Sequence, residues 1–241
     1  MLKKILKKAG VLLMAVSILS LLGCNQVNEA TAKKVEEKLE KKYGEKFEVQ
    51  ALGNRWGTKE NNTVKSIVKA TKNNVIFDAV MNKNGKLESE TYLIHKIGAE
   101  AGSVLTQNLQ KEGITSKVKL RAAGGKKLEL NDSTITLPEY IKSHSPKKFV
   151  GIMILEDSEN ASPEKIIKGF KSAYVDLSET KLQTLTLIVA SEDYDDAVEV
   201  FNENADVSDD WLEEFKIKAK FYLYMDEEGF QSDHEEFQNQ S

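Results

Sequence analysis

Apolar side chains recur along this chain at two spacings, one typical of helices and the other of strands. A repeat of three to four residues predicts an amphipathic helix over residues 32–44, ended by Gly44. Its apolar side carries Val35, Leu39 and Tyr43. The same repeat predicts a longer helix over residues 89–112, whose apolar stripe consists of Ile94, Ile97, Ala101, Leu105 and Leu109.

Two glycines interrupt the longer predicted helix. Glycine is unfavourable inside a helix, because it has more backbone freedom to lose than any other residue. Gly98 and Gly102 therefore suggest that another backbone comes close. We expect a strand to pack against the helix at this place.

Further helices are expected in the second half of the chain. Ser162, Pro163 and Glu164 supply a hydroxyl N-cap, a proline and an acid, which together predict the start of a helix. Another helix is expected over residues 193–204, and a short helical segment opens at Pro138.

Alternating or continuous apolar runs predict strands along the whole chain. The continuous runs are expected to be buried, and the run at 149–155 is expected to be a central strand. Gly124 and Gly125 predict a β-hairpin between the strands on either side of them. In chain order the expected strands cover residues 47–51, 63–71, 75–82, 117–122, 128–130, 149–155 and 182–190.

The last predicted strand, residues 215–225, has the most regular alternation. Phe215, Ile217, Ala219, Phe221, Leu223 and Met225 fall on one face. A period of two over this length predicts a long antiparallel strand with one buried face. The other face carries the candidate binding residues Lys216, Lys218, Lys220, Tyr222 and Tyr224.

Together these elements predict an α+β protein of two related units, residues 32–130 and 131–226, followed by a polar tail at 227–241. In each unit, helices are expected on one face of an antiparallel or mixed sheet. An internal duplication is one interpretation, because the spacing of Val35, Leu39 and Tyr43 recurs in Ile166, Phe170 and Tyr174. Residues 63–68 and 184–189 are also similar, as are Phe77, Met81 and Gly85 to Phe221, Met225 and Gly229. Chance similarity between amphipathic segments is the other interpretation.

The N-terminus has the composition of an export signal. Its first eight residues contain four lysines, and residues 9–22 carry no charge. A basic segment followed by a short apolar one is typical of a secretory signal peptide, here residues 1–23. The apolar run is shorter than the roughly 20 residues that a transmembrane helix needs.

The signal ends in Leu21, Leu22, Gly23 and Cys24, which resemble the lipobox of bacterial lipoproteins. Leu22 is bulkier than the commonest residue at its position. The resemblance implies cleavage before Cys24 and an S-diacylglyceryl group on its thiol, and an additional N-linked acyl chain such as palmitate is left open. Cys24 is the only cysteine in the chain, so it has no intramolecular disulfide partner. Residues 24–31 are then expected to be a tether.

Charge and composition narrow the function further. Without residues 1–23 the chain would keep 30 basic and 38 acidic residues, a net charge of −8, which argues against a general nucleic-acid binder. The chain that remains after removal of residues 1–23 is long enough for one large domain or two small domains, each with a hydrophobic core. It resembles the many uncharacterised surface lipoproteins of Bacillus-like, Gram-positive bacteria, which implies a cell-membrane location on the extracytoplasmic face.

No catalytic, metal or cofactor motif is present in the sequence. His95, His144 and His234 lie far apart in sequence, without metal-ligand spacing. There is neither a nucleophile elbow nor a phosphate-binding glycine loop. The acidic clusters at 192–196 and 226–228 lack the pattern of a calcium loop, and capping and solvation explain them more simply. We therefore predict no enzyme activity, no metal and no cofactor.

The leading hypothesis is a lipid-anchored, non-enzymatic protein that binds an envelope protein or polymer. A second basic surface is formed by Lys117, Lys119, Arg121, Lys126 and Lys127, which could meet anionic headgroups or teichoic acid or could simply be a solvated strand face. Two alternatives remain: a solute-binding lipoprotein of a transporter and an envelope hydrolase.

Overall fold

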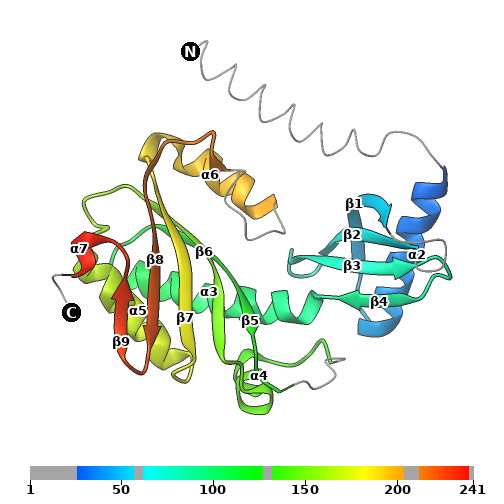
Figure 1. Ribbon diagram of the computed structural model, residues 1–241, viewed down its shortest axis with the longest axis horizontal. Helices are drawn as coiled ribbons and strands as arrows, with labels where there is room; N and C mark the ends of the chain where they lie inside the picture. Colours follow the sequence, from blue (N-terminus) through cyan, green and yellow to red (C-terminus); the bar gives the residue numbers. More distant parts are fainter. Residues whose placement is uncertain (1–25, 57–61, 127–131, 204–211, 239–241) are drawn as a thin grey trace, which may run out of the picture. The chain divides into compact units, whose positions relative to one another are not determined.

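The computed structural model describes residues 26–56, 62–126, 132–203 and 212–238. It has the predicted α+β fold, with helices interleaved among the strands of two sheets (Figure 1). The chain divides into two compact units, and the boundary in the sequence lies between Tyr92 and Leu93. Among the described helices, none is both long and apolar enough to cross a membrane.

The first unit is one helix and an antiparallel sheet. The strands follow one another across the sheet in the order β1-β2-β3-β4. Turns at Asn74 and Gly85, which both have positive φ, join the inner strands. Its elements are α2 (Gln26–Tyr43), β1 (Phe47–Trp56), β2 (Thr63–Ala70), β3 (Ile76–Asn82) and β4 (Leu87–Glu90).

An aromatic cluster closes the core of the first unit. Tyr92 lies against three other rings, with centroid distances of 5.0 Å to Tyr43, 5.1 Å to Phe47 and 5.1 Å to Phe77. Val35 and Leu39 of α2 are fully buried, as the predicted stripe requires. Helix α2 nevertheless begins at Gln26, within the segment expected to be a tether. Residues 26–31 contain neither glycine nor proline, so the helix continues through them.

The second unit contains a mixed sheet in the order β5-β6-β7-β8-β9. Strands β6 and β7 are parallel and are connected through α5, whereas the other neighbours are antiparallel. The elements are α3 (Tyr92–Lys111), β5 (Ser116–Ala123), α4 (Leu137–His144), β6 (Lys148–Glu156), α5 (Pro163–Asp176), β7 (Lys181–Val189), α6 (Ser191–Glu203), β8 (Ile217–Asp226), β9 (Gly229–Ser232) and α7 (Glu235–Gln238).

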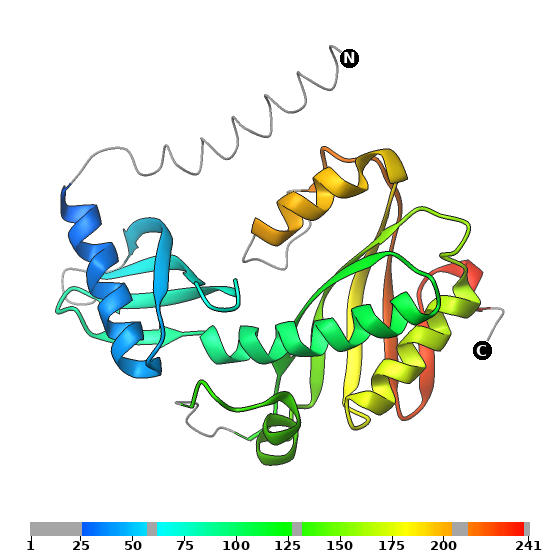
Figure 2. The ribbon, with the colours of Figure 1, turned by 180° about the vertical axis from the view of Figure 1, so that it is seen from behind.

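Helices cover the two faces of this sheet unequally. Figure 2 shows α3 and α5 on one face and α6 on the other. The larger core lies under α3 and α5, and includes Leu105, Phe149, Phe170 and Leu223. The smaller core lies under α6, where Tyr194, Ala197 and Phe201 contact the sheet.

The unit boundary differs from the one expected at residue 131. Helix α3 belongs with the second sheet, because Ile97, Ala101 and Leu105 share a core with Val118 and Leu120. Strand β5 also belongs there, since it pairs with β6 over its whole length. The hairpin partner expected at 128–130 lies outside the described residues.

The two glycines of α3 make the close approach that the sequence predicts. A Cβ atom on Gly98 would lie 1.9 Å from the carbonyl oxygen of Leu120, and one on Gly102 would lie 2.8 Å from that of Val118. Any side chain larger than hydrogen would therefore push α3 away from β5.

The end of the chain is more ordered than the polar tail expected over 227–241. Chain reversal at Gly229 starts β9, which pairs with β8, and α7 follows. Phe237 is 4% exposed and lies 5.2 Å from Phe221 and 5.8 Å from Phe230, ring centroid to centroid. The packing of Phe230 and Phe237 and the pairing of β9 with β8 therefore hold this segment against the core.

Both units pack helices on a sheet, as predicted, but their strand pairing differs. Val64 of β2 lies opposite Met81, whereas the residue that matches Val64 in sequence spacing, Leu185, lies opposite Tyr222 and not opposite Met225. The second sheet also contains a parallel pair that the first sheet lacks. The match in spacing therefore does not extend to the register of the sheets.

Candidate functional site

Strand β8 divides its side chains between the two faces of the sheet. Phe221, Leu223 and Met225 are buried under the helices α3 and α5. Lys220 and Tyr222 are exposed on the other face, and Tyr224 is partly exposed there. Lys218 is also exposed, at a position where the pairing of β8 with β7 is irregular. Lys216 lies just before β8. The irregularity between Ile217 and Ala219 corrects the predicted alternation, because Phe215 and Ile217 pack with the smaller core under α6 and not with the larger core. The face of β8 that was predicted to be polar is therefore outside the larger core.

Strand register brings the basic residues of β5 onto this same face. Reading across the sheet, Arg121 lies beside Val150, Gln183, Tyr224 and Gln231 in turn. In the neighbouring row, Lys119 lies beside Ile152, Leu185 and Tyr222 in turn. The basic β5 residues and the Lys-Tyr face of β8, which the sequence presents as separate surfaces, thus form one surface.

Helix α6 covers only part of this surface. It packs on Ile152, Ile154, Leu187 and Val189, which are at most 2% exposed. In Figure 1, α6 lies over the upper ends of the strands. We use the term open face for the part away from α6, which consists of Arg121, Lys148, Val150, Gln183, Tyr222 and Tyr224.

Basic side chains dominate this side of the sheet, and several are already neutralised. Lys216 pairs with Glu192 at 3.2 Å, and Lys218 lies 3.8 Å from Asp157. Lys181 contacts two acids of the β8–β9 turn, Asp226 and Glu227. These contacts give part of the two acidic clusters a structural role. Arg121, by contrast, is exposed and forms no ion pair with a described residue.

The pKa values of Lys119 and Tyr224 on this surface are shifted by burial. Lys119 Nζ donates a hydrogen bond to the carbonyl oxygen of Phe201 and lies 5.0 Å from its ring centroid. Burial and the charge of Lys117 nevertheless lower the pKa of Lys119 to about 8. Burial also raises the pKa of Tyr224, whose ring stacks on that of Tyr222 at a centroid distance of 6.1 Å.

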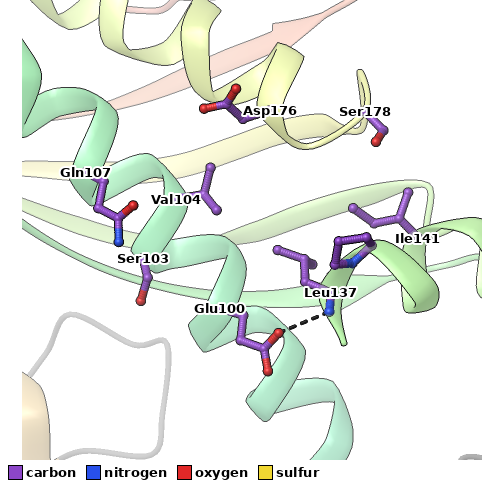
Figure 3. A pocket seen from close by; sticks show the side chains of 9 residues that line it. Glu100, Ser103, Val104, Gln107, Leu137, Ile141, Asp176 and Ser178 are labelled. Carbon is purple, nitrogen blue, oxygen red and sulfur yellow. Dashed lines mark hydrogen bonds between the residues drawn. The ribbon is translucent and has the colours of Figure 1, made fainter. Parts of the chain in front are cut away.

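A shallow groove of about 380 Å³ lies between α3, α4 and the end of α5 (Figure 3). Its two carboxylates accept hydrogen bonds from other parts of the protein. Glu100 accepts hydrogen bonds from the backbone N–H of Leu137 at 3.1 Å and from Lys96 at 2.8 Å. Asp176 accepts one from Asn108 at 2.8 Å. Both acids therefore have hydrogen-bond partners within the protein.

The three histidines lie on separate elements and make separate contacts. His144 is buried, stacks on Tyr140 at 4.5 Å and hydrogen-bonds Ser143 at 2.8 Å. His234 lies 4.8 Å from the ring of Phe221, and His95 is partly exposed on α3. Within the described parts of the chain, no three His, Cys, Asp or Glu residues are grouped so as to hold a metal ion.

Comparison with known proteins identifies a similar fold. No protein-family model and no curated protein matches the chain. The chain is similar to the crystal structure of a DUF5037 family protein from Ruminococcus gnavus ATCC 29149, with a TM-score of 0.59 and 14% sequence identity. The match covers 86% of this chain and 97% of that chain. At this identity the similarity shows the fold alone, and DUF denotes a domain of unknown function.

Some of the site residues predicted from the sequence lie on this surface, and others lie outside the described residues. Four of the five candidate binding residues lie on β8, and the register adds three residues from other strands that the sequence did not select: Lys148, Val150 and Gln183. Their positions depend on the pairing of distant segments, which no local signal gives. The lipobox residues Leu21, Leu22, Gly23 and Cys24 lie outside the described residues, as does Lys127.

Proposed function

We propose that this chain is a lipid-anchored protein on the extracytoplasmic face of the cell membrane, where it binds another envelope component and catalyses no reaction. The observation that carries the anchor is Cys24, which is the only cysteine and directly follows Leu21, Leu22 and Gly23 at the end of a basic and apolar leader. Two acyl chains are enough for stable membrane anchoring.

The open face supports a binding role. It is a broad surface with an exposed arginine and a pair of tyrosines, and residues of this kind recur where proteins bind partners.

The anchor is tested by metabolic labelling with an alkyne fatty acid in a bacterial host. We expect the wild-type chain to be labelled and membrane-bound, and Cys24→Ala to lose the label and remain uncleaved or become soluble. Leu22→Ala is the matched control, since it changes the lipobox but keeps the thiol, and it should be labelled normally. Labelling that persists in Cys24→Ala would refute the anchor.

Separate assays test the binding role against its two alternatives. A thermal-shift screen with small metabolites should leave the melting temperature unchanged, and marked stabilisation by one solute would indicate a transporter-linked binding protein. Incubation with peptidoglycan and peptide libraries should release no product. Turnover of either substrate would replace the binding role with that of an envelope hydrolase.

A further inference from the structure

We infer that the open face binds an extended phosphate-bearing polymer, of the polyol-phosphate type found in cell envelopes. This inference rests on the proposed binding role and gives it a ligand class. It follows from three features of the open face: its width, its charge and its aromatic residues.

The shape of the open face suits a long chain better than a small molecule. Neighbouring strands lie about 4.8 Å apart, so the row from Arg121 on β5 to Tyr224 on β8 spans roughly 14 Å. The row continues to Gln231 on β9. Side chains that stand in line across a sheet offer repeated contacts to a ligand with repeated groups. A compact solute would need a concave pocket, and the groove described above lies at α3, α4 and α5.

The charge of the open face is opposite to that of the protein as a whole. The chain carries a net charge of −4, whereas the row from Arg121 to Gln231 contains one basic and no acidic side chain. Two acids adjoin the open face: Asp226 at the end of β8 pairs with Lys181, and Asp233 accepts a hydrogen bond from the backbone N–H of Tyr222 at 2.7 Å. Arg121 is exposed and forms no ion pair with a described residue, so its guanidinium is available to a ligand. Lys148 donates to Gln183 at 2.7 Å, a neutral partner, and forms no ion pair with an acid of the described segments.

Arginine favours phosphate as the anionic group. Its planar guanidinium donates two parallel hydrogen bonds to phosphate oxygens, and it is more weakly hydrated than an ammonium group. Lys148 would add a second cationic contact two strand positions away from the Arg121 row. A polymer with one phosphate in each repeat can contact both sites at once.

The tyrosines give the open face an apolar area between the charges. Tyr222 is 40% exposed, and its ring stacks on Tyr224. Such rings combine a wide apolar surface with a polar hydroxyl, which suits the carbon backbone and hydroxyls of a polyol chain. Val150 extends the apolar area onto β6.

The test measures binding of purified poly(glycerol phosphate), free of lipid, to the full chain in non-ionic detergent. We expect binding that weakens as salt is raised, because screening reduces contacts between exposed charges. Arg121→Glu and Tyr224→Ala should each weaken it by about tenfold or more, whereas Arg121→Lys should retain part of it. Lys171→Glu is the matched charge reversal, since Lys171 is exposed on α5 beyond the opposite face of the sheet.

Several outcomes would overturn the inference. Equal weakening by Lys171→Glu would show a general charge effect, and undetectable binding by the wild-type chain would refute the ligand class. Tighter binding to phosphatidylglycerol vesicles, to polyuridylate or to polyglutamate would assign the open face to a lipid surface, a nucleic acid or an acidic peptide instead. Circular dichroism of each variant should match the wild type, so that lost binding is not lost folding.

The experiments distinguish a wrong ligand class from a wrong assignment of the lipid anchor. Absent polymer binding with normal Cys24 labelling overturns the ligand and leaves the anchored protein. Polymer binding without Cys24 labelling overturns the anchor and leaves the ligand. The two measurements use different residues, Cys24 for labelling and Arg121 and Tyr224 for polymer binding, so each set of variants tests one claim.

Discussion

The ammonium group of Lys119 lies under α6, where it donates a hydrogen bond to the carbonyl oxygen of Phe201. Its pKa is about 8 in the folded protein, against 10.5 in an unfolded chain. Between these pH values the unfolded chain binds more protons than the folded one. The contribution of Lys119 to the free energy of unfolding should therefore rise with pH across this window. Below pH 8 both states are protonated, and the whole cost of burying the charge is present.

This effect is measured by denaturant unfolding of wild type and Lys119→Met at several pH values. We expect the wild type to gain about 1–3 kcal/mol relative to Lys119→Met between pH 8 and pH 10.5, since one pKa unit corresponds to about 1.4 kcal/mol. Lys171→Met, an exposed control on α5, should follow the wild type in parallel. Parallel curves for Lys119→Met and wild type would mean that Lys119 keeps an ordinary pKa.

Single residues show which local signals can be read from sequence. The N-cap at Ser162 forms as predicted, with its hydroxyl accepting from Lys165 N at 3.5 Å, because capping involves only residues next to one another. The burial of Phe237 was missed, since its partners Phe221 and Phe230 reach it only after β8 and β9 have paired. Nor did the sequence single out Gly151, although a Cβ there would lie 1.8 Å from Lys119 O.

Helix α3 lies very close to strand β5 at Gly98. In an isolated helix, Gly98→Ala should add about 1 kcal/mol of stability through helix propensity. In the protein, the new Cβ would lie 1.9 Å from a backbone oxygen that has no flexible side chain to move. We expect this clash to prevail and to lower the free energy of unfolding by about 2 kcal/mol or more.

The matched control is Ser103→Ala, on the exposed side of the same helix. It should change stability by less than about 0.5 kcal/mol, as is usual for surface substitutions. Chemical denaturation of the two variants decides the matter. A stabilised Gly98→Ala protein would mean that α3 lies farther from β5 than described, and that helix propensity governs this position.

Element boundaries and element pairing differ in how far sequence predicts them. The stripe of Ile97, Ala101, Leu105 and Leu109 predicts α3 well, because helix periodicity is local. The same stripe cannot say which sheet the helix covers, and the unit boundary was therefore expected near residue 131. Strand β5 likewise was recognised, whereas its pairing with β6 requires a contact across the intervening α4.

At the level of the whole chain, each unit has its own buried aromatic anchor. Phe77 is fully buried among the rings of the first unit, where Phe47 lies 5.7 Å away. Phe170 is fully buried in the larger core of the second unit, 5.7 Å from Phe230. Among the described residues, the cores under α3, α5 and α6 include none from the first sheet. We therefore expect the two units to unfold in separate transitions.

Calorimetry of Phe77→Ala, Phe170→Ala and the double variant tests this separation. Each single change should cost about 3–5 kcal/mol in its own unit and leave the other transition in place. The two effects should add in the double variant, because the residues share no partner. A single transition that both changes lower together would instead mean that the units fold as one cooperative body, and that a ligand on the open face of the second unit would stabilise the first unit as well.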